Sequence, residues 1–381
     1  MAKLGMPTVV VKFIEAGIEA IQRSQRGIVA LILEDTKQVI DKLATKTNGH
    51  EVLPNPFLVY TVDDIPEELS DKNKDYILKA LKGYNKPPLK VVVYMMQQGG
   101  DKAGADRFQE PLKAMLTERF DYLAIPTIET AQLEYVSTWV KTARENKFKK
   151  IKVVLPGSNA DYEGVINFGN TKVVTADREY KAAEYTARIA GLVAGTNMTQ
   201  SATYAPLTEV IDCDRHTQDE MDTMVNEGKF FIWYDGEKFK MSRAMNSLVT
   251  TSQGKLEGYQ TIKIVDIMDM IYDDIRKTAQ DSYIGKYTND YENKCLLISA
   301  ILGYFKQLEN ERLLQKDYST CEIDCEAVRT YQLSHGLFTK EELAKMSDDE
   351  VKKLDTKKIV FLKAKVRPLD AMEDIQLPIN I

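Results

Sequence analysis

The sequence has little of what metal sites, triad enzymes and membrane anchors require. Its 381 residues include only three histidines, His50, His216 and His335, and none lies in an H-E-x-x-H or similar ligand pair. No apolar run approaches the ~20 residues that cross a bilayer, and the first residues lack the apolar stretch of a signal peptide. We therefore expect a protein that stays in the cytosol until the cell lyses, with no direct membrane insertion.

Cysteine is also scarce, with four residues in the whole chain. Without a secretion signal these are most simply reduced thiols. Cys321 and Cys325 would share one face of a helix, and Cys213 with His216 offers a second pair that could complete a four-ligand zinc site. Neither pair has the C-x-x-C spacing of a zinc knuckle, and cysteine is a common core residue. The sequence therefore favours core cysteines and no metal.

The charge balance gives no sign of a nucleic-acid partner. The net charge is −6 and the isoelectric point is near 5.4, with lysine and arginine scattered among the acids. A surface for nucleic acid or anionic membrane would gather basic residues on one face. Partners are therefore expected to be proteins. At roughly 100–200 residues per domain, the length indicates two or three domains.

Strand-like and helix-like segments alternate through the first part of the chain. Residues 27–33 are apolar throughout, as in a strand buried on both faces. Residues 39–56 read as loop-like or weakly structured. The other predicted elements are strands at 57–62, 91–96, 122–126, 151–156, 165–168 and 172–175 and helices at 71–81, 108–118, 130–145 and 180–194. This alternation predicts an α/β fold with a doubly wound parallel sheet covered on both faces.

A smaller α+β domain is predicted after residue 244. A hairpin at 230–241, with Asp235-Gly236 as its two-residue turn, closes the α/β part. Helices are then predicted at 262–278, 291–314, 325–333 and 341–354, with a closing strand at 359–366. The resulting division is an N-terminal arm at 1–20, an α/β domain at 21–244, a C-terminal domain at 245–366 and a C-terminal arm at 367–381.

Both ends of the sequence show the two-residue alternation of a strand with one apolar face. A chain end normally frays into polar coil, so these ends indicate strands that need a sheet to join. Pro378 falls at an outward position, which suits an edge or added strand. The apolar positions are Val9, Val11 and Phe13 at one end and Ile375, Leu377, Ile379 and Ile381 at the other.

The catalytic motifs that an α/β sheet often carries are absent or incomplete. Gly99 to Gly104 is a glycine-rich turn, but it lacks the Lys-Ser/Thr of a P-loop and the G-x-G-x-x-G spacing of a dinucleotide fold. No G-x-S-x-G elbow occurs, and the nearest match to a subtilisin nucleophile motif has Asn197 where the serine belongs. Asp273 and Asp274 fit a solvated, salt-bridged helix face. No catalytic, cofactor-binding or metal-binding residue is predicted.

Four segments together resemble one family. In chain order the segments are A-I-Q-R-S-Q-R-G-I-V-A-L-I-L-E-D (20–35), A-R-I-A-G-L-V-A-G-T-N-M-T-Q-S-A-T-Y-A-P-L (187–207), N-S-L-V-T-T (246–251) and F-L-K-A-K-V-R-P-L-D-A-M-E-D-I-Q-L-P-I-N-I (361–381). They are similar to the sheath proteins of contractile phage tails and of phage-tail-like bacteriocins, particularly the short forms of Gram-positive prophages. The first and last segments are the most specific.

The resemblance implies a fold and a mode of assembly. The α/β part would be similar to subtilisin in fold but without activity. The arms would leave their own subunit and add strands to the C-terminal domain of neighbouring subunits. The arm strands would be the apolar positions of the two ends, and the receiving strand would carry Val360, Leu362, Ala364 and Val366.

The resemblance also implies a function and partners. Copies would form hexameric rings stacked around a tail tube, assembled in the bacterial host cytoplasm as part of a virion tail or phage-tail-like particle. Contraction would drive the tube through a cell envelope, with the energy stored in subunit interfaces instead of a nucleotide. Expected partners are further copies, the tube protein, and baseplate and tail terminator proteins, with a charged helix at 322–334 or 291–315 facing the tube.

Two alternative functions remain open from the residues alone. A cytosolic α/β hydrolase would need a reactive serine or cysteine in a compact monomer or small oligomer. A non-catalytic α/β ligand-binding protein would form a defined oligomer and no filaments.

Overall fold

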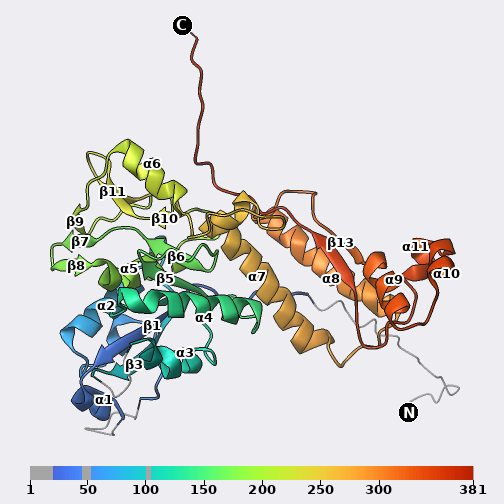
Figure 1. The fold of residues 1–381 in the computed structure, drawn as a ribbon, viewed down its shortest axis with the longest axis horizontal. Coiled ribbons are helices and arrows are strands. Elements are labelled where there is room, and N and C mark those ends of the chain that lie inside the picture. The colour runs from blue at the N-terminus through green and yellow to red at the C-terminus, as the bar shows by residue number, and fades with distance from the viewer. Residues whose placement is uncertain (1–19, 45–52, 100–103, 381) are drawn as a thin grey trace, which may run out of the picture. The chain divides into compact units, whose positions relative to one another are not determined.

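The computed structural model describes residues 20–44, 53–99 and 104–380 (Figure 1). The chain divides into two compact units. The larger unit runs from Arg23 to Asp273 and resumes at Pro368, whereas the smaller comprises Asp274–Arg367 and the described residues up to Gln22. The division falls inside a helix, α7 (Ile262–Thr278). The domain limits inferred from the sequence stay a prediction, because a compact unit is not by itself an independently folding domain.

A mostly parallel sheet forms the core of the larger unit. Its seven strands follow the order β10-β6-β5-β4-β1-β3-β2, and only β2 pairs antiparallel with its neighbour. Strand β1 lies inside the sheet and is buried along almost its whole length, which explains its continuous apolar sequence. The strands are β1 (Ile28–Asp35), β2 (Phe57–Val59), β3 (Lys90–Gln97), β4 (Tyr122–Ala124), β5 (Lys152–Pro156), β6 (Val165–Phe168) and β10 (Lys229–Phe230).

Helices cover both faces of this sheet. Successive residues of β1 point to opposite faces, so Val29 and Leu31 join one apolar cluster while Ile28 and Ala30 join another. One cluster contains residues of two helices, α2 (Asp71–Leu81) and α5 (Ala182–Ala194), and the other contains residues of α3 (Gln109–Met115) and α4 (Leu133–Glu145). The mixed α/β character expected from the sequence is therefore confirmed.

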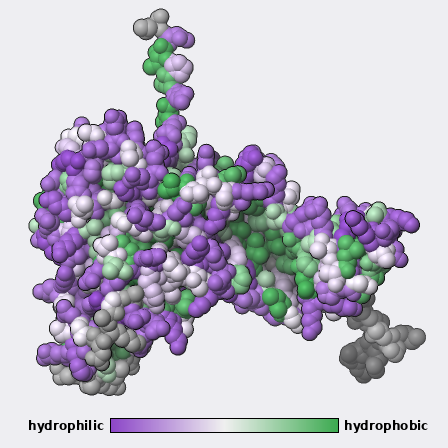
Figure 2. All heavy atoms as spheres, viewed as in Figure 1, coloured by the Kyte–Doolittle hydropathy of each residue, from purple (hydrophilic) through white to green (hydrophobic). Residues whose placement is uncertain are grey.

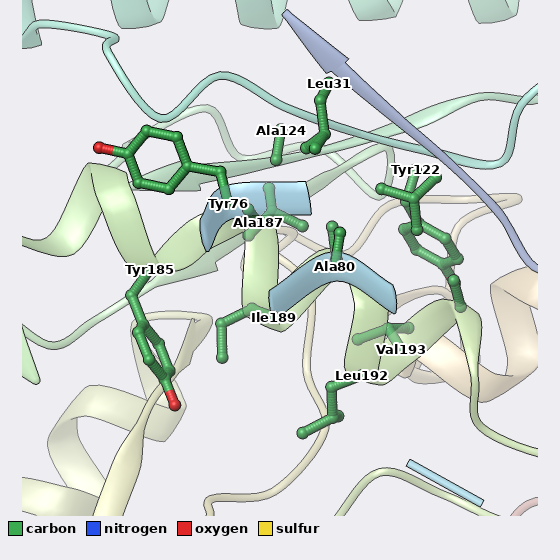
Figure 3. Packing of buried hydrophobic residues seen from close by; sticks show 14 of the residues in the cluster. Leu31, Tyr76, Ala80, Tyr122, Ala124, Tyr185, Ala187, Ile189, Leu192 and Val193 are labelled. Atoms are coloured by element: carbon green, nitrogen blue, oxygen red, sulfur yellow. The ribbon is translucent and has the colours of Figure 1, made fainter. Parts of the chain in front are cut away.

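Helix α5 lies close to α2 because the side chains between them are small. A Cβ atom added at Gly191 would sit 2.0 Å from the backbone oxygen of Ala80, so no larger residue fits there without moving a backbone. Figure 3 shows this part of the core, with Ala80, Ala187 and Ile189 among its residues. The alanine-rich pattern of this helix thus serves packing.

The segment after β1 differs from the sequence prediction. Residues 39–56 were expected to be loop-like, but a short helix, α1 (Lys37–Ala44), occupies their beginning. It starts after Thr36, whose carbonyl oxygen accepts the N–H groups of Val39 and Ile40, both at 3.1 Å. Only Leu43 of this helix is buried. With eight residues the helix has only about two turns, so its apolar positions are too few to establish a helical period in the sequence.

The hairpin of the larger unit also differs slightly. Its loop is Gly236–Glu237 instead of Asp235-Gly236, because the Asp235 N–H donates to the Lys238 carbonyl at 3.1 Å. The Asp235 carboxylate accepts the N–H groups of Glu237 (2.9 Å) and Lys238 (2.7 Å), which places this aspartate at the first turn position. The further elements here are β7 (Lys172–Thr175), β8 (Glu179–Lys181), β9 (Val210–Cys213), α6 (Gln218–Asn226), β11 (Ile232–Tyr234) and β12 (Phe239–Met241).

The smaller unit is mostly helical and contains a two-stranded ribbon. The predicted helix at 341–354 is two short helices, because Ser347 caps the second by accepting the N–H of Glu350 at 3.4 Å. No helix in the described ranges combines the length and apolar character of a membrane span. The elements are α8 (Tyr291–Asn310), β13 (Thr320–Ile323), α9 (Cys325–Ser334), α10 (Lys340–Lys345), α11 (Asp348–Val351) and β14 (Leu362–Lys365).

A buried charge network holds the first turns of α7 on the α/β core of the larger unit. Asp269 accepts two hydrogen bonds from the Arg144 guanidinium, at 2.9 and 3.0 Å, and one from Lys152 Nζ at 2.7 Å. Lys152 also pairs with Asp266, one helical turn away, at 2.9 Å. The side chains of Asp269, Arg144 and Lys152 are almost fully buried. Each charge is therefore compensated by a direct partner.

The neighbouring aspartates do not form the solvated face that the sequence indicated. Asp274 is fully buried, and its carboxylate accepts a hydrogen bond from the Tyr304 hydroxyl at 2.7 Å. Asp273 pairs at 2.9 Å with Arg26, which also pairs with Asp121 at 3.0 Å. Pattern reasoning failed here because their partners are far away in the sequence.

We predict that Asp269→Asn destabilises the protein and weakens its response to acid. Burial alone raises the pKa of Asp269, but the facing Lys152 and Arg144 outweigh burial and lower the pKa to about 2. The carboxylate thus contributes stability above its unfolded pKa of about 4, and that contribution is lost as the pH falls through about 2. At neutral pH the substitution should lower the free energy of unfolding by about 3–5 kcal/mol, because two buried cations lose a partner.

Urea denaturation followed by circular dichroism between pH 7 and pH 2 measures both effects. The variant should show a flatter loss of stability between about pH 4 and pH 2. Asp41→Asn is the matched control, because Asp41 and Lys37 form an exposed pair worth less than about 1 kcal/mol. Equal acid profiles for the Asp269 variant and the unmodified chain would contradict the prediction.

Candidate functional site

The two histidines within the described residues take part in local structure. The Nδ1 atom of His335 lies 3.0 Å from Ser334 Oγ, but both groups also bond to the carbonyl oxygen of Tyr331, so they close the end of α9. His216 packs edge-on against an aromatic ring. Asn197, at the position of a subtilisin-like nucleophile, follows α5 and is exposed. These contacts are those of helix ends and packing.

The cysteines are free thiols, and they are not arranged as the zinc hypothesis requires. Cys321 lies in β13 while Cys325 opens α9, so the two do not share a helix face. Burial raises the pKa of Cys213 and of Cys321, each to about 11, which keeps both protonated at neutral pH. Within the part of the chain that the structure describes, no three metal-ligating side chains gather into a site.

The clearest unusual surface is the C-terminal arm. From residue 375 onward the described chain runs without a strand or helix partner and extends away from the elements of its own unit (Figure 1). Ile375, Leu377 and Ile379 are 82%, 75% and 76% exposed. Figure 2 shows apolar residues along this projecting segment. Three large exposed apolar side chains at strand spacing indicate a surface that another chain covers.

The predicted receiving strand lies in the ribbon of the smaller unit. Strand β14 pairs antiparallel with β13, with Leu362 opposite Ile323, and the described residues add no third strand. A sheet of only two strands is marginally stable. Leu362 and Ala364 lie in β14, whereas Val360 and Val366 flank it. The structure thus brings together part of the predicted receiving strand, beside an edge that can accept a further strand.

The ribbon also carries features that protect an open edge. Lys363 pairs with Glu322 across the ribbon at 3.3 Å, and Lys365 lies over the Tyr318 ring, 4.7 Å from its centroid. Lysine on an edge strand discourages unwanted pairing. The open edge of β14 therefore carries charged side chains of the kind that limit unspecific strand pairing. The predicted N-terminal arm strand, Val9 to Phe13, lies outside the described residues, as does Ile381.

The comparisons with known proteins decide between the open alternatives. Residues 101–247 match the family model for the phage tail sheath protein central domain, and residues 255–381 match that for the phage tail sheath C-terminal domain. The chain belongs to the phage tail sheath protein family. The tail sheath protein of Clostridium phage phiCD119 is 32% identical to it over 99% of both chains.

Solved structures of sheath proteins share the fold. A crystal structure of a sheath tail protein from Desulfitobacterium hafniense superposes with a TM-score of 0.67 at 19% identity, covering 83% of this chain and 94% of that one. The contracted helical sheath of the anti-feeding prophage gives a TM-score of 0.68 at 12% identity, covering 99% of both chains. Membership in the tail sheath family makes this sheath protein a structural subunit of a phage tail, and nothing supports the hydrolase alternative.

Sequence reasoning about this sheath protein missed the strand that pairs with the receiving strand. Residues 320–323 alternate between exposed and buried side chains, which is the period of a strand. No strand is predicted there from the sequence, and the charged helix predicted at 322–334 takes in part of the stretch. Two signals could have separated the strand from the helix. One is that alternation. The other is Asp324, which caps α9 by accepting the N–H groups of Glu326 and Ala327, both at 3.1 Å.

We predict that residues 375–381 add almost nothing to the stability of an isolated sheath subunit. The side chains of Ile375, Leu377 and Ile379 are exposed, so deleting the segment should change the free energy of unfolding by less than about 0.5 kcal/mol. Urea denaturation of the dispersed subunit measures this. Leu308→Ala, at a fully buried position, is the positive control and should cost about 2–5 kcal/mol. A loss above about 1 kcal/mol on deletion would mean that the arm packs on its own subunit.

Proposed function

We propose that copies of this chain are linked into a sheath by strand exchange, in which the C-terminal arm of one subunit pairs with the ribbon of another. The exposed face of Ile375, Leu377 and Ile379 supports this proposal. The open edge of β14 supplies the complementary backbone groups. In strand addition, backbone hydrogen bonds provide affinity and alternate side chains provide specificity. This chain has both an open backbone edge, on β14, and an arm with alternate apolar side chains.

The N-terminal arm would add a further strand through Val9, Val11 and Phe13. Pairing of both arms with the ribbon would give a sheet wide enough for independent stability, because three or more strands with an apolar face suffice. An arm from one copy inserted into the next makes a head-to-tail contact, and such contacts generate rings or helices. We propose hexameric rings stacked in a helix.

Contraction would follow from this linkage without enzymatic chemistry. Exchanged strands would keep the subunits connected while their folded bodies slide and rotate into a more stable packing. The energy would be stored in the subunit interfaces, so the proposal includes no catalytic residue, no cofactor and no nucleic-acid partner. We also propose that the α/β sheet is similar to that of subtilisin.

The remaining partners are part of the proposal. The sheath would surround a tail tube and end at baseplate and tail terminator proteins, with assembly in the bacterial host cytoplasm. A charged helix would contact the tube, either α8 or α9. The helix proposed from the sequence at 322–334 begins at Cys325, because Glu322 lies in β13.

We predict that Leu377→Asp blocks sheath formation while leaving the subunit folded. The charge would be buried against the ribbon of the next copy, where it has no partner. The concentration needed for assembly should rise at least about tenfold, since one buried leucine contributes about 1.5–3 kcal/mol. Sedimentation and negative-stain electron microscopy measure the outcome.

The matched control for this variant is Gln376→Asp. It adds the same charge one residue away, on the opposite face of the alternation, and should leave assembly nearly unchanged. Normal sheath tubes from the Leu377 variant, or equal loss of assembly in both variants, would reject strand exchange through this face.

We predict that charge reversal on the tube-facing helix abolishes co-sedimentation with purified tubes. Glu326 is exposed on α9 and Glu292 on α8, so Glu326→Lys and Glu292→Lys test the two helices separately. Subunit folding is checked by circular dichroism, because either reversal near a helix N-terminus should cost only about 0.3–1 kcal/mol. Unaltered tube binding by both variants would exclude both helices.

A further inference from the structure

The C-terminal chain is held at two successive places before it becomes free. The first hold is at Arg367 in the smaller unit. Its carbonyl oxygen accepts the N–H of Gln315 at 2.8 Å, and its guanidinium donates to Gln315 Oε1 (3.1 Å) and to the Tyr318 hydroxyl (3.3 Å). The guanidinium also lies over the Tyr318 ring, 4.2 Å from the centroid. The chain then passes into the larger unit at Pro368.

The second hold is a cluster of polar side chains around Glu373 in the larger unit. The Glu373 carboxylate accepts hydrogen bonds from Thr203 Oγ1 (2.5 Å) and Ser201 Oγ (3.2 Å), and it pairs with Arg243 Nε at 3.3 Å. The same guanidinium donates to Asp374 at 2.5 Å. Glu373 is thus bound by two hydroxyls and one arginine, and the same arginine also binds Asp374.

The two hydroxyl groups that bind Glu373 are also hydrogen-bonded to the backbone of the larger unit. Thr203 Oγ1 accepts the N–H of Ala244 at 2.9 Å, so its own hydrogen is free to point at the carboxylate. Ser201 Oγ accepts the N–H of Thr203 at 3.1 Å. These bonds hold both hydroxyls in place without the arm. An isolated exposed ion pair contributes little, but several fixed donors on one carboxylate form a real anchor.

Glu373 is the last side chain of the arm that is mostly buried, and it is an isolated one, since Met372 just before it is 93% exposed. The Glu373 side chain is 15% exposed and that of Asp374 is 74% exposed, and the apolar residues beyond are open to solvent. The arm therefore departs from the body at residue 374, well after the limit at 367 that the sequence indicated. We propose that Arg243 and Glu373 form a clamp that sets the departure point of the exchanged arm, and thereby restricts exchange to an adjacent copy.

The reach of the arm follows from where it departs. At about 3.3–3.6 Å per residue, residues 375–381 span at most about 25 Å. If the clamp opened, residues 368–381 could span about 50 Å from the hold at Arg367. A tether of twice the length lowers the effective concentration of its end by about threefold. The closed clamp therefore favours a receiving ribbon close by, and this inference rests on the proposed strand exchange.

Proteolysis by the glutamate-specific protease Glu-C tests the clamp itself. The full chain is used below its assembly concentration, and mass spectrometry follows the release of residues 374–381 after cleavage at Glu373. Arg243→Gln should raise this cleavage rate about tenfold, because cleavage tracks the population of the opened state. Asp374→Asn alters no residue of the body and should raise the rate in the same direction. Lys229→Gln, which breaks a different surface pair, should not.

The assembly concentration of the same variants tests the consequence. Arg243→Gln should raise it about threefold or more, and Lys229→Gln should leave it unchanged. Unaltered cleavage in both clamp variants would overturn the clamp. Faster cleavage with unaltered assembly would overturn its role in setting reach. Normal assembly by Leu377→Asp would instead reject strand exchange, whatever the cleavage rates show.

Discussion

Backbone hydrogen bonding at an open strand edge is the constraint on which the rest of this molecule depends. Strand β14 has only β13 beside it within the described residues, and a ribbon of this size cannot hold its structure by backbone pairing alone. The C-terminal arm has the opposite deficit, with strand periodicity and no sheet. Pairing between the arm and β14 would give the arm a sheet and the ribbon a third strand. Strand addition is the general way in which proteins join such surfaces.

Bonds inside the larger unit differ in kind from those that hold the base of the C-terminal arm. The buried pairs of Asp269 with Arg144 and Lys152 join α7 to the sheet through bonds that lose much energy when one partner is removed. The arm, in contrast, is held by Glu373 and Arg243 at the surface. Strong bonds inside the unit and weaker bonds at the base of the arm are what the proposed movement of linked subunits would require.

The sequence predicted what depends on local periodicity and missed what depends on distant partners. The helix at 71–81 and the alternation from Ile375 to Ile381 can both be recognised from neighbouring residues, and the helix is confirmed. The burial of Asp274 by Tyr304 and the contact of Glu373 with Arg243 join residues far apart in the chain, so no local pattern encodes them. Family resemblance supplied the proposed receiving strand, which sequence chemistry alone could not have chosen.

An electron cryo-microscopy map of the sheath assembled from this chain tests the central claim most directly. The account predicts continuous density from Asp374 of one copy into a strand that lies beside residues 362–365 of another copy. The side chains of Ile375, Leu377 and Ile379 should be buried there. Density that folds residues 375–381 back onto their own subunit, or leaves them unpaired in the assembled sheath, would contradict it.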